Sequence, residues 1–237
     1  MSSPTLSVIV FAFNEETNIA PVLGELVDWL RVNEPGAEVI FIDDGSQDRT
    51  AEAAERALAP LTHTVLRHPM NLGIGAALKT GVAAARAPFV TFLPADGQIP
   101  PSAISTLTRA SEGADVVLSV YERRDDGLHR KVLSFGARAL IFALHGVRLR
   151  SDGPYLFRRS LFDPSQLAPD TFFLNFEFPL RALGAGLVVR TVTVPCRKRL
   201  SGQSKSAGLG RILGVGKDLA SLRARRLRDI VALSLGR

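Results

Sequence analysis

The sequence predicts an α/β domain in which a mostly parallel central sheet is flanked by helices. Apolar runs of strand length alternate with alanine-rich, helix-like stretches through the first half of the chain, and this alternation is typical of sheets built from strand–helix–strand units. The strand-like runs are almost continuously apolar, as expected of strands covered on both faces. With 237 residues and 46% hydrophobic content, the chain can bury a large core as a single domain.

The first predicted strand starts at Leu6 and ends at Asn14, Glu15 and Glu16, where a helix is expected to begin. Asn14 and Thr17 have side chains suited to capping a helix, because their oxygens accept hydrogen bonds from the first free backbone N–H groups. The acidic residues would lie in the first turn, where the helix dipole favours them.

The second predicted strand, residues 38–42, ends in the turn Asp43-Asp44-Gly45-Ser46 and is followed by an alanine-rich helix from about Arg49 to Leu58. In open α/β sheets, ligands bind in the crevice at the carboxyl ends of the strands. The side chains expected to share this crevice are Phe13, Asn14, Glu15, Asp43, Asp44 and, from a later strand, Asp96.

A short predicted strand, residues 64–66, leads into the glycine-containing segment 71–81. Glycine lets the backbone approach a ligand closely, and the start of the helix that follows offers amide donors to an anion. The segment is not a dinucleotide-binding fingerprint, which would open directly from the first strand. An anion-binding turn and an ordinary glycine turn are the two interpretations at this point.

The fourth predicted strand, residues 89–93, ends at Pro94-Ala95-Asp96-Gly97-Gln98, the most informative stretch of the chain. A hard divalent cation prefers oxygen ligands, so one carboxylate at a strand end suffices when a diphosphate supplies further oxygens. The stretch therefore indicates a metal held against phosphate. The alternative is an ordinary Asp-Gly turn.

Taken in order, these segments resemble those of family 2 glycosyltransferases with the GT-A fold. The resemblance is closest to the branch of dolichol-phosphate mannose synthases and other polyprenyl-phosphate glycosyltransferases, and it covers roughly residues 6–206. The matching residues are Ser7–Val10 with Asn14–Glu16; Asp43–Ser46 with Asp48 and Thr50; Asn71, Gly73, Gly75, Ala76 and Gly81; Ala95–Gln98 with Pro100 or Pro101; Ser151–Gly153; Phe157–Arg159; Glu177; and Arg199–Lys205.

This resemblance implies an inverting transferase that uses a UDP- or GDP-sugar together with Mg²⁺ or Mn²⁺. Phe13 and Asp44 match positions that hold the nucleotide base, by ring stacking and by accepting a base N–H. Asp96 matches the metal-binding carboxylate, with Gln98 beside it, and the metal neutralises charge on the departing nucleoside diphosphate. The residues expected to bind the nucleotide sugar are Phe11, Ala12, Phe13, Glu15, Asp43, Asp44, Asn71, Gly73, Lys79, Ala95 and Asp96.

The chain departs from the family pattern at one position that bears on the metal. Where the family usually has Asp-x-Asp, this sequence has Pro94-Ala95-Asp96. A single carboxylate still coordinates a metal when diphosphate and water complete the shell. A metal-dependent enzyme is therefore the main expectation, and a non-catalytic homologue that binds a nucleotide sugar is the alternative.

The resemblance also implies a polyprenyl or other lipid phosphate as the acceptor. A phosphate monoester is already an anionic nucleophile, whereas a hydroxyl acceptor, such as a glycan or a small metabolite, needs a general base. Asp152 and Glu177 join Asp96 as candidate catalytic residues. One of the two would be the base for a hydroxyl acceptor, and neither is needed as a base for a phosphate.

Cationic residues after the metal motif are candidates for binding the phosphates. Arg123 and Arg124 follow the predicted strand 116–120, and guanidinium groups bind phosphate in a bidentate manner. Pairing with the two acidic residues that come next is the alternative. Further candidates, in a Gly- and Ser-rich loop that is expected to close when substrate binds, are Arg199, Ser204 and Lys205.

The net positive charge of the chain comes from its end, because residues 197–237 hold eleven Lys or Arg and only two Asp. We divide the chain into a catalytic domain, residues 1–206, and a basic amphipathic helical tail, residues 207–237. Such a helix is typical of binding to a membrane surface. The alternatives are packing on the catalytic domain or in a homodimer. Nucleic-acid binding is not expected, because the tail lacks interleaved aromatic residues.

The remaining features predict a cytoplasmic protein that lies peripherally at the inner face of the membrane. No run approaches the ~20 apolar residues that span a bilayer, and the N-terminus leads into the first strand without a signal peptide. A second amphipathic stretch, residues 131–147, is expected to pack in the core. The single Cys196 excludes an intramolecular disulfide, and the scattered histidines lack the spacing of a zinc site.

Overall fold

The computed structural model describes residues 3–122, 128–167, 173–197 and 219–224. The chain forms two compact units. Unit 1 contains residues 1–124 and 151–202, and unit 2 contains residues 125–150 and 203–237. The predicted boundary between residues 206 and 207 lies outside the described residues and stays a prediction.

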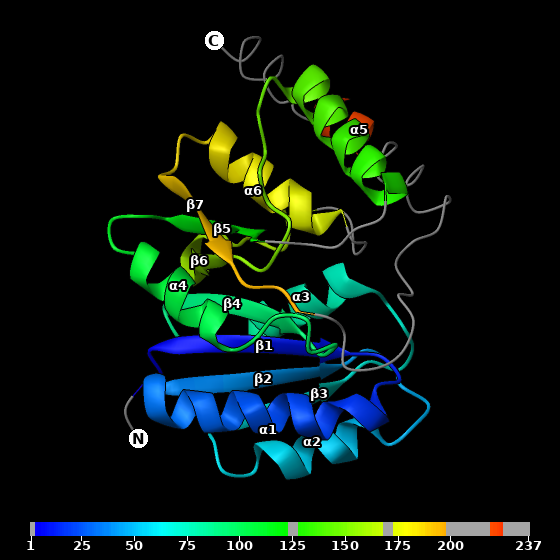
Figure 1. The fold of residues 1–237 in the computed structure, drawn as a ribbon, viewed down its shortest axis with the longest axis vertical. Coiled ribbons are helices and arrows are strands. Elements are labelled where there is room, and N and C mark those ends of the chain that lie inside the picture. Colours follow the sequence, from blue (N-terminus) through cyan, green and yellow to red (C-terminus); the bar gives the residue numbers. More distant parts are fainter. Residues whose placement is uncertain (1–2, 123–127, 168–172, 198–218, 225–237) are drawn as a thin grey trace. The chain divides into compact units, whose positions relative to one another are not determined.

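Within the described residues, unit 1 is built on one seven-stranded sheet with the strand order β3-β2-β1-β4-β6-β5-β7 (Figure 1). The strands β3, β2, β1 and β4 are parallel, as are β5 and β7, whereas β6 is antiparallel to both of its neighbours. This arrangement confirms the predicted mostly parallel sheet. The strands are β1 (Leu6–Ala12), β2 (Ala37–Asp43), β3 (His63–Arg67), β4 (Phe89–Pro94), β5 (Val116–Tyr121), β6 (Leu156–Arg158) and β7 (Val189–Val194).

The two strands at the centre of the parallel part, β1 and β2, are buried at every position. Their register places Val8 opposite Val39 and Ala12 opposite Asp43. Burial on both faces explains why these runs lack the polar alternation of a half-exposed strand. It also means that the side chains after the last strand residue are the first ones able to meet a ligand.

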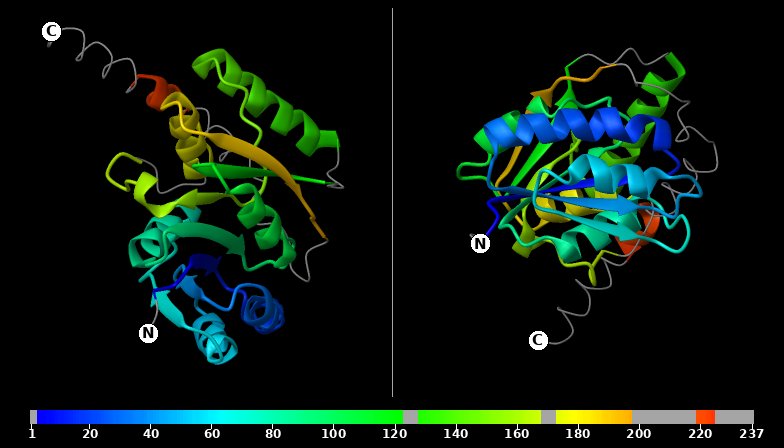
Figure 2. Two further views of the ribbon diagram at one scale, coloured as in Figure 1. Left: turned by 90° about the vertical axis from the view of Figure 1, so that its left-hand side faces the viewer. Right: turned by 90° about the horizontal axis from the view of Figure 1, so that it is seen from below.

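Helices pack on both faces of this sheet (Figure 2). On one face, α1, α2 and α4 share a buried apolar cluster with Val8 and Val10 of β1. On the other face, α3 approaches β1 so closely that a side chain at Gly81 would collide with Ile9. Side chains alternate between the two faces along a strand, so Ile9 points away from the side of Val8 and Val10. The helices of unit 1 are α1 (Glu16–Asn33), α2 (Thr50–Leu58), α3 (Ile74–Ala84), α4 (Ser102–Ala110) and α6 (Leu174–Gly184), with a 3-10 helix at Arg159–Leu161.

The start of α1 differs from the sequence-based expectation. Asn14 and Thr17 were predicted to cap this helix, and that prediction is wrong: α1 begins at Glu16 after Glu15, whose side chain makes no capping bond, and the Glu16 N–H donates to Asp48 Oδ2 at 3.2 Å. Asn14 instead adopts a left-handed conformation with φ of 52°, which asparagine tolerates better than most residues. Its side chain accepts a hydrogen bond from the turn after β2 instead of capping α1.

In unit 2, the described residues form α5 (Leu128–His145) and a short helical segment at residues 219–224. Leu140 and Phe142 of α5 are 40% and 49% exposed, so the expectation that this stretch packs in the core is wrong for these two side chains. In the short segment, Leu219 and Leu222 are buried while Arg223 is exposed, which is the pattern of an amphipathic helix. None of the helices that the structure describes is both long enough and apolar enough to cross a membrane.

Candidate active site

The carboxyl ends of β1, β2 and β4 bring the predicted nucleotide-binding residues together at one edge of the sheet. The backbone N–H of Asp44 donates to the carbonyl oxygen of Ala12 at 2.9 Å, and the N–H of Ala95 donates to that of Phe11 at 3.3 Å. The turns after β2 and β4 therefore flank the end of β1 on its two sides. Phe13, which comes next after these residues, is only half-buried.

The turn after β1 is bonded to the turn after β2. The Asn14 N–H donates to Ser46 Oγ at 2.9 Å, and the Gln47 N–H donates to Asn14 Oδ1 at 2.8 Å. The Glu15 N–H donates to Thr50 Oγ1 at 2.9 Å. These bonds give Asn14, Ser46 and Thr50 of the family motifs a local task, because they fix the backbone that carries Phe13.

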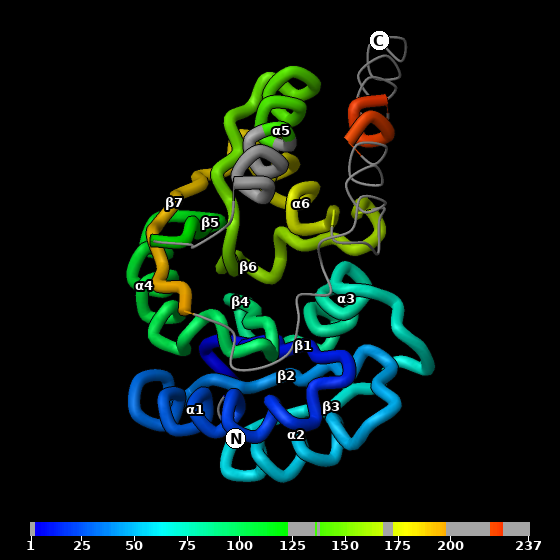
Figure 3. Tube along the Cα trace, turned by 45° about the vertical axis from the view of Figure 1, so that its right-hand side comes forward, coloured from blue at the N-terminus to red at the C-terminus, as the bar shows by residue number. Residues whose placement is uncertain are grey.

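Asp44 holds the loop between β3 and α3 against this edge; Figure 3 shows the path of that loop into α3. Its Oδ1 accepts from the Leu72 N–H at 3.0 Å and its Oδ2 from the Gly73 N–H at 2.9 Å. His68 Nδ1 lies 2.7 Å from Asp44 Oδ1, and His68 Nε2 lies 3.0 Å from Thr80 Oγ1. Contacts within the described chain thus use three of the roughly four lone-pair positions of this carboxylate.

Gly45 is required where the turn after β2 passes this loop. Its φ is +77°, and a side-chain carbon here would lie 2.3 Å from the carbonyl carbon of Met70 and 2.6 Å from the backbone nitrogen of Asn71. Glycine therefore permits a close approach that any other residue would block. The loop that results carries Asn71, which is exposed, and Gly73, which directly precedes the first residue of α3.

The other predicted nucleotide-binding side chains have varied surroundings. Asp43 is buried, accepts from the Ser46 N–H at 3.0 Å and lies 3.6 Å from Arg67 Nε, so it orders the turn itself. Glu15 is half-buried and accepts from Asn18 Nδ2 at 2.7 Å. Lys79 is half-buried on α3.

The predicted metal-binding turn, residues 96–98, follows β4. The Gln98 N–H donates to Asp96 Oδ1 at 3.0 Å, and Gly97 has a φ of 69°. Asp96 and Gln98 are both half-buried. Carboxylate and amide oxygens suit Mg²⁺ or Mn²⁺, so the donor set fits such an ion if a diphosphate adds further oxygens. Among the described residues, no three His, Cys, Asp or Glu side chains gather to hold a metal by themselves.

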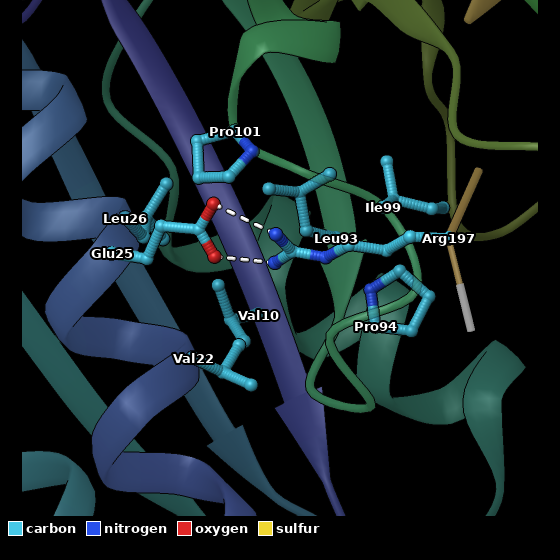
Figure 4. A pocket seen from close by; sticks show the side chains of 9 residues that line it. All are labelled: Val10, Val22, Glu25, Leu26, Leu93, Pro94, Ile99, Pro101 and Arg197. Carbon is cyan, nitrogen blue, oxygen red and sulfur yellow. Dashed lines mark hydrogen bonds and ion pairs between the residues drawn. The ribbon is translucent and has the colours of Figure 1, made fainter. Parts of the chain in front are cut away.

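Arg197, just beyond β7, contacts the same turn and was not anticipated from the sequence. Its backbone N–H donates to the Gln98 carbonyl at 2.8 Å, and its Nε donates to the Gly97 carbonyl at 2.6 Å. The remaining guanidinium nitrogens pair with both carboxylate oxygens of Glu25 on α1. Figure 4 shows this pair at a small cavity between α1 and the end of β4. The hydrogen bond to Glu25 raises the pKa of Arg197 above its ordinary value.

The two candidate bases on the acceptor side differ in accessibility. Asp152 is exposed, and its backbone N–H donates to the Ser119 carbonyl of β5 at 2.9 Å. Glu177 on α6 is fully buried and accepts from Arg181 Nε at 2.9 Å. Because Glu177 is fully buried against Arg181, an acceptor hydroxyl has no access to its carboxylate in this structure. The predicted residues that lie outside the described part of the chain are Arg123, Arg124, Arg199, Ser204 and Lys205.

Comparison with solved structures defines the class of the fold. Glucosyl-3-phosphoglycerate synthase from Mycobacterium tuberculosis, solved in complex with Mn²⁺, UDP and glucosyl-3-phosphoglycerate, matches with a TM-score of 0.70 at 23% identity, over 94% of this chain and 80% of that one. The same enzyme solved with Mg²⁺ and UDP gives a TM-score of 0.70 at 22% identity, over 94% and 79% of the two chains. The fold is therefore the GT-A fold, as predicted.

The sequence then identifies the family. Residues 7–181 match glycosyl transferase family 2, and the chain belongs to this family. It is 30% identical over 223 residues to the undecaprenyl-phosphate 4-deoxy-4-formamido-L-arabinose transferase of Pseudomonas paraeruginosa, covering 91% of this chain and 64% of that protein. It is 30% identical over 175 residues to a dolichyl-phosphate beta-glucosyltransferase of Trichomonas vaginalis, covering 67% and 54%. The chain thus spans less than two thirds of the length of these relatives.

Proposed function

We propose that this chain is a glycosyltransferase that moves a sugar from a UDP- or GDP-sugar to a polyprenyl or other lipid phosphate. The observation that carries the proposal is the meeting of three strand ends, where Phe13, the loop held by Asp44 and the Asp96 turn lie at one edge of the sheet. The names of the undecaprenyl-phosphate and dolichyl-phosphate transferases among its relatives support the lipid phosphate as acceptor.

On the donor side, each residue has a distinct task. The Phe13 ring stacks on the base, and the remaining lone pair of Asp44 accepts a base N–H. The first turn of α3, which begins at Ile74, directs backbone N–H groups at the phosphates. Asp96 and Gln98 would hold Mg²⁺ or Mn²⁺, and the ion would supply positive charge to neutralise the leaving diphosphate. The structural relatives solved with UDP and either ion support this assignment.

On the acceptor side, a lipid phosphate attacks the anomeric carbon from the face opposite the leaving group, so the reaction inverts the configuration. It needs cations to hold the acceptor phosphate rather than a base, and we assign this task to Arg123, Arg124, Arg199 and Lys205, with the Ser204 hydroxyl as a neutral hydrogen-bond donor. A hydroxyl acceptor is the second candidate. Asp152 would then be the base in preference to Glu177, because it is exposed and Glu177 is buried against Arg181.

Nucleotide binding tests the donor half of the proposal. We expect calorimetry to show that one of UDP or GDP binds in the presence of Mn²⁺ or Mg²⁺ and that EDTA weakens this binding. Asp96→Asn keeps the shape of the side chain but removes its charge, and should abolish the effect of the metal. Binding that is indifferent to metal and to Asp96→Asn would indicate a non-catalytic nucleotide-sugar protein. No binding at all would refute the proposal.

Sugar transfer tests the acceptor half. With a lipid phosphate as acceptor, Asp152→Asn should leave turnover within a few-fold of the unsubstituted protein. With a hydroxyl acceptor, the same substitution should remove a contribution of about 10²–10⁴-fold. Glu177→Gln serves as the matched control, since its expected defect is in folding under either mechanism.

The lipid acceptor also places the protein at a membrane surface, and we assign it to the cytoplasmic face as a peripheral protein. The basic tail, residues 207–237, would provide the contact. We expect the chain to sediment with vesicles that contain anionic phospholipid and not with neutral vesicles, and salt should weaken this association. A homodimer that covers the tail instead would appear by light scattering and would abolish vesicle binding.

A further inference from the structure

Arg197 connects three segments that are distant in the sequence. It follows β7, it bonds to the turn after β4, and it pairs with Glu25 in the middle of α1. The backbone N–H, Nε and both terminal nitrogens of its guanidinium all have partners. Pro94 and Ile99, on either side of the turn, line the same small cavity as the Arg197–Glu25 pair (Figure 4).

We infer that Arg197 is a positioning residue, which holds the Asp96–Gln98 turn in the form that binds the metal and the diphosphate of the donor. This inference rests on the proposed function. The two carbonyl groups that Arg197 bonds belong to Gly97 and Gln98, the residues directly after Asp96. Fixing both carbonyls fixes the backbone from which the Asp96 carboxylate projects.

The internal bond of the turn makes this restraint effective. The Gln98 N–H donates to Asp96 Oδ1, so the carboxylate orientation depends on the orientation of the 97–98 peptide. That peptide carries the Gly97 carbonyl, to which Arg197 Nε donates at 2.6 Å. A rotation of the peptide would break both bonds together. Glu25 in turn prevents the guanidinium from swinging away.

Only an arginine meets these demands. Its planar guanidinium offers Nε to one partner and a fork of two nitrogens to another, whereas lysine presents one compact ammonium without this geometry. The side chain is 37% exposed and that of Glu25 is 41% exposed. An ion pair this accessible adds little stability by itself. The arrangement is therefore better suited to orienting the turn than to holding the fold together.

Three substitutions separate the contacts. Arg197→Lys keeps the positive charge opposite Glu25 but removes the Nε bond to Gly97. Glu25→Gln weakens the ion pair and leaves the Nε bond in place. Arg86→Lys is the matched control, since Arg86 also uses backbone N–H and Nε to hold a carboxylate, that of Glu38, at the opposite edge of the sheet.

The first measurement is Mn²⁺ affinity in the presence of UDP or GDP, followed by electron paramagnetic resonance. We expect Arg197→Lys to weaken it about 10-fold or more, since groups that orient metal ligands typically contribute 10–100-fold. Glu25→Gln should give a smaller loss, and Arg86→Lys none, even if its melting temperature falls. Equal affinities for Arg197→Lys and the unsubstituted protein, with both fully folded, would overturn the inference.

Hydrogen exchange provides a second measurement that needs no ligand. We expect Arg197→Lys to accelerate exchange in the peptide that contains residues 95–99, with no change in peptides of α2. Unchanged exchange there would overturn the inference. If the unsubstituted protein binds no nucleotide while Arg197→Lys does accelerate exchange, the restraint on the turn stands and the proposed function fails.

Discussion

Glu38 and Asp44 lie at the two ends of β2, and each is a buried carboxylate that holds one end of α3. Glu38 accepts from Ser7 Oγ at 2.7 Å and from the N–H and Nε of Arg86, which follows the last turn of α3, at 2.7 and 2.8 Å. Asp44 accepts from the N–H groups of the residues before the first turn of α3. The strand β2 is therefore hydrogen-bonded, through these two carboxylates, to the segments at both ends of α3.

The partners of the two carboxylates differ in charge and in surroundings. At the amino-terminal edge, a guanidinium neutralises Glu38, and the Ala87 N–H completes the network by donating to Ser7 Oγ at 3.1 Å. At the carboxyl-terminal edge, Asp44 receives backbone N–H groups and an imidazole, and the loop beside it exposes Leu72 by 45%. The Glu38 anchor therefore belongs to the structure of the sheet alone, whereas the Asp44 anchor lies beside the proposed nucleotide site.

Removing the anchor at the amino-terminal edge should have the largest effect on stability. We expect Glu38→Ala to lower the free energy of unfolding by about 2–6 kcal/mol, because the Ser7 hydroxyl and the Arg86 backbone N–H each lose their acceptor at a cost of about 1–3 kcal/mol. Urea unfolding measures this loss. Nucleotide affinity of the folded fraction should not change, and a parallel loss of affinity would show that the two edges are not independent.

A change at the other edge should divide its effect between stability and binding. Asp44→Asn puts an amide in place of one acceptor oxygen, so we expect a loss of about 1–3 kcal/mol in the free energy of unfolding. Nucleotide affinity should also fall by about 10-fold, equivalent to 1.4 kcal/mol. Unfolding and calorimetry on the same preparation test both. A stability loss with unaltered affinity would assign Asp44 to the fold alone.

Acid should act on the Glu38 network in a defined direction. Burial alone would raise the pKa of Glu38, but hydrogen bonds from Ser7 and from the backbone and side chain of Arg86 outweigh it and hold the pKa below the ordinary 4.5. The resulting stabilisation is fully present above pH 4.5 and is lost as the pH falls through the folded-state pKa. The stability difference between the unsubstituted protein and Glu38→Gln should therefore shrink below pH 4.5.

A comparison of unfolding free energies from neutral to acidic pH would reveal this convergence. Glu112→Gln, at an exposed position after α4, is the control for general effects of charge removal. A difference that stays constant with pH would contradict the assignment of the stabilisation to the Glu38 carboxylate.

The smallest effect is expected at a buried polar group that belongs to neither anchor. The Tyr155 hydroxyl has no hydrogen-bond partner within the described residues, its ring packs on Phe92 and Phe178, and burial raises the pKa of its phenol. Tyr155→Phe should be neutral or stabilising by up to about 1 kcal/mol in thermal or urea unfolding. A clear destabilisation would mean that the hydroxyl is satisfied by residues outside the described part.

The strands of the parallel half were predictable because their signal is local. Continuous apolar runs followed by polar turns correctly predicted the positions of β1, β2 and β4 and the residues at which they end. The helix expected from Arg49 to Leu58 is found at Thr50–Leu58. The strand β6 was not predicted, since three residues, Leu156–Arg158, are too few to show a period.

Site residues that depend on partners far along the chain could not be predicted. Arg197 and Glu25 are 172 positions apart, and His68 is 24 positions from Asp44. No spacing or local pattern marks such pairs, because the sheet topology creates them. The capping role predicted for Asn14 failed for a related reason, since its side chain bonds to the turn after β2, 33 positions away.

The reversed strand β6 has a consequence for how such a protein can be altered. It pairs with β4 at only two positions and with β5 at only two, all of them near the amino-terminal ends of those strands. Within the sheet, the half that carries Asp44 and Asp96 is therefore joined to the half that carries Asp152 by only a few backbone pairings through β6. Donor and acceptor specificity should be exchangeable as separate modules, and a chimera joined between α4 and β5 should keep the donor preference of its N-terminal parent.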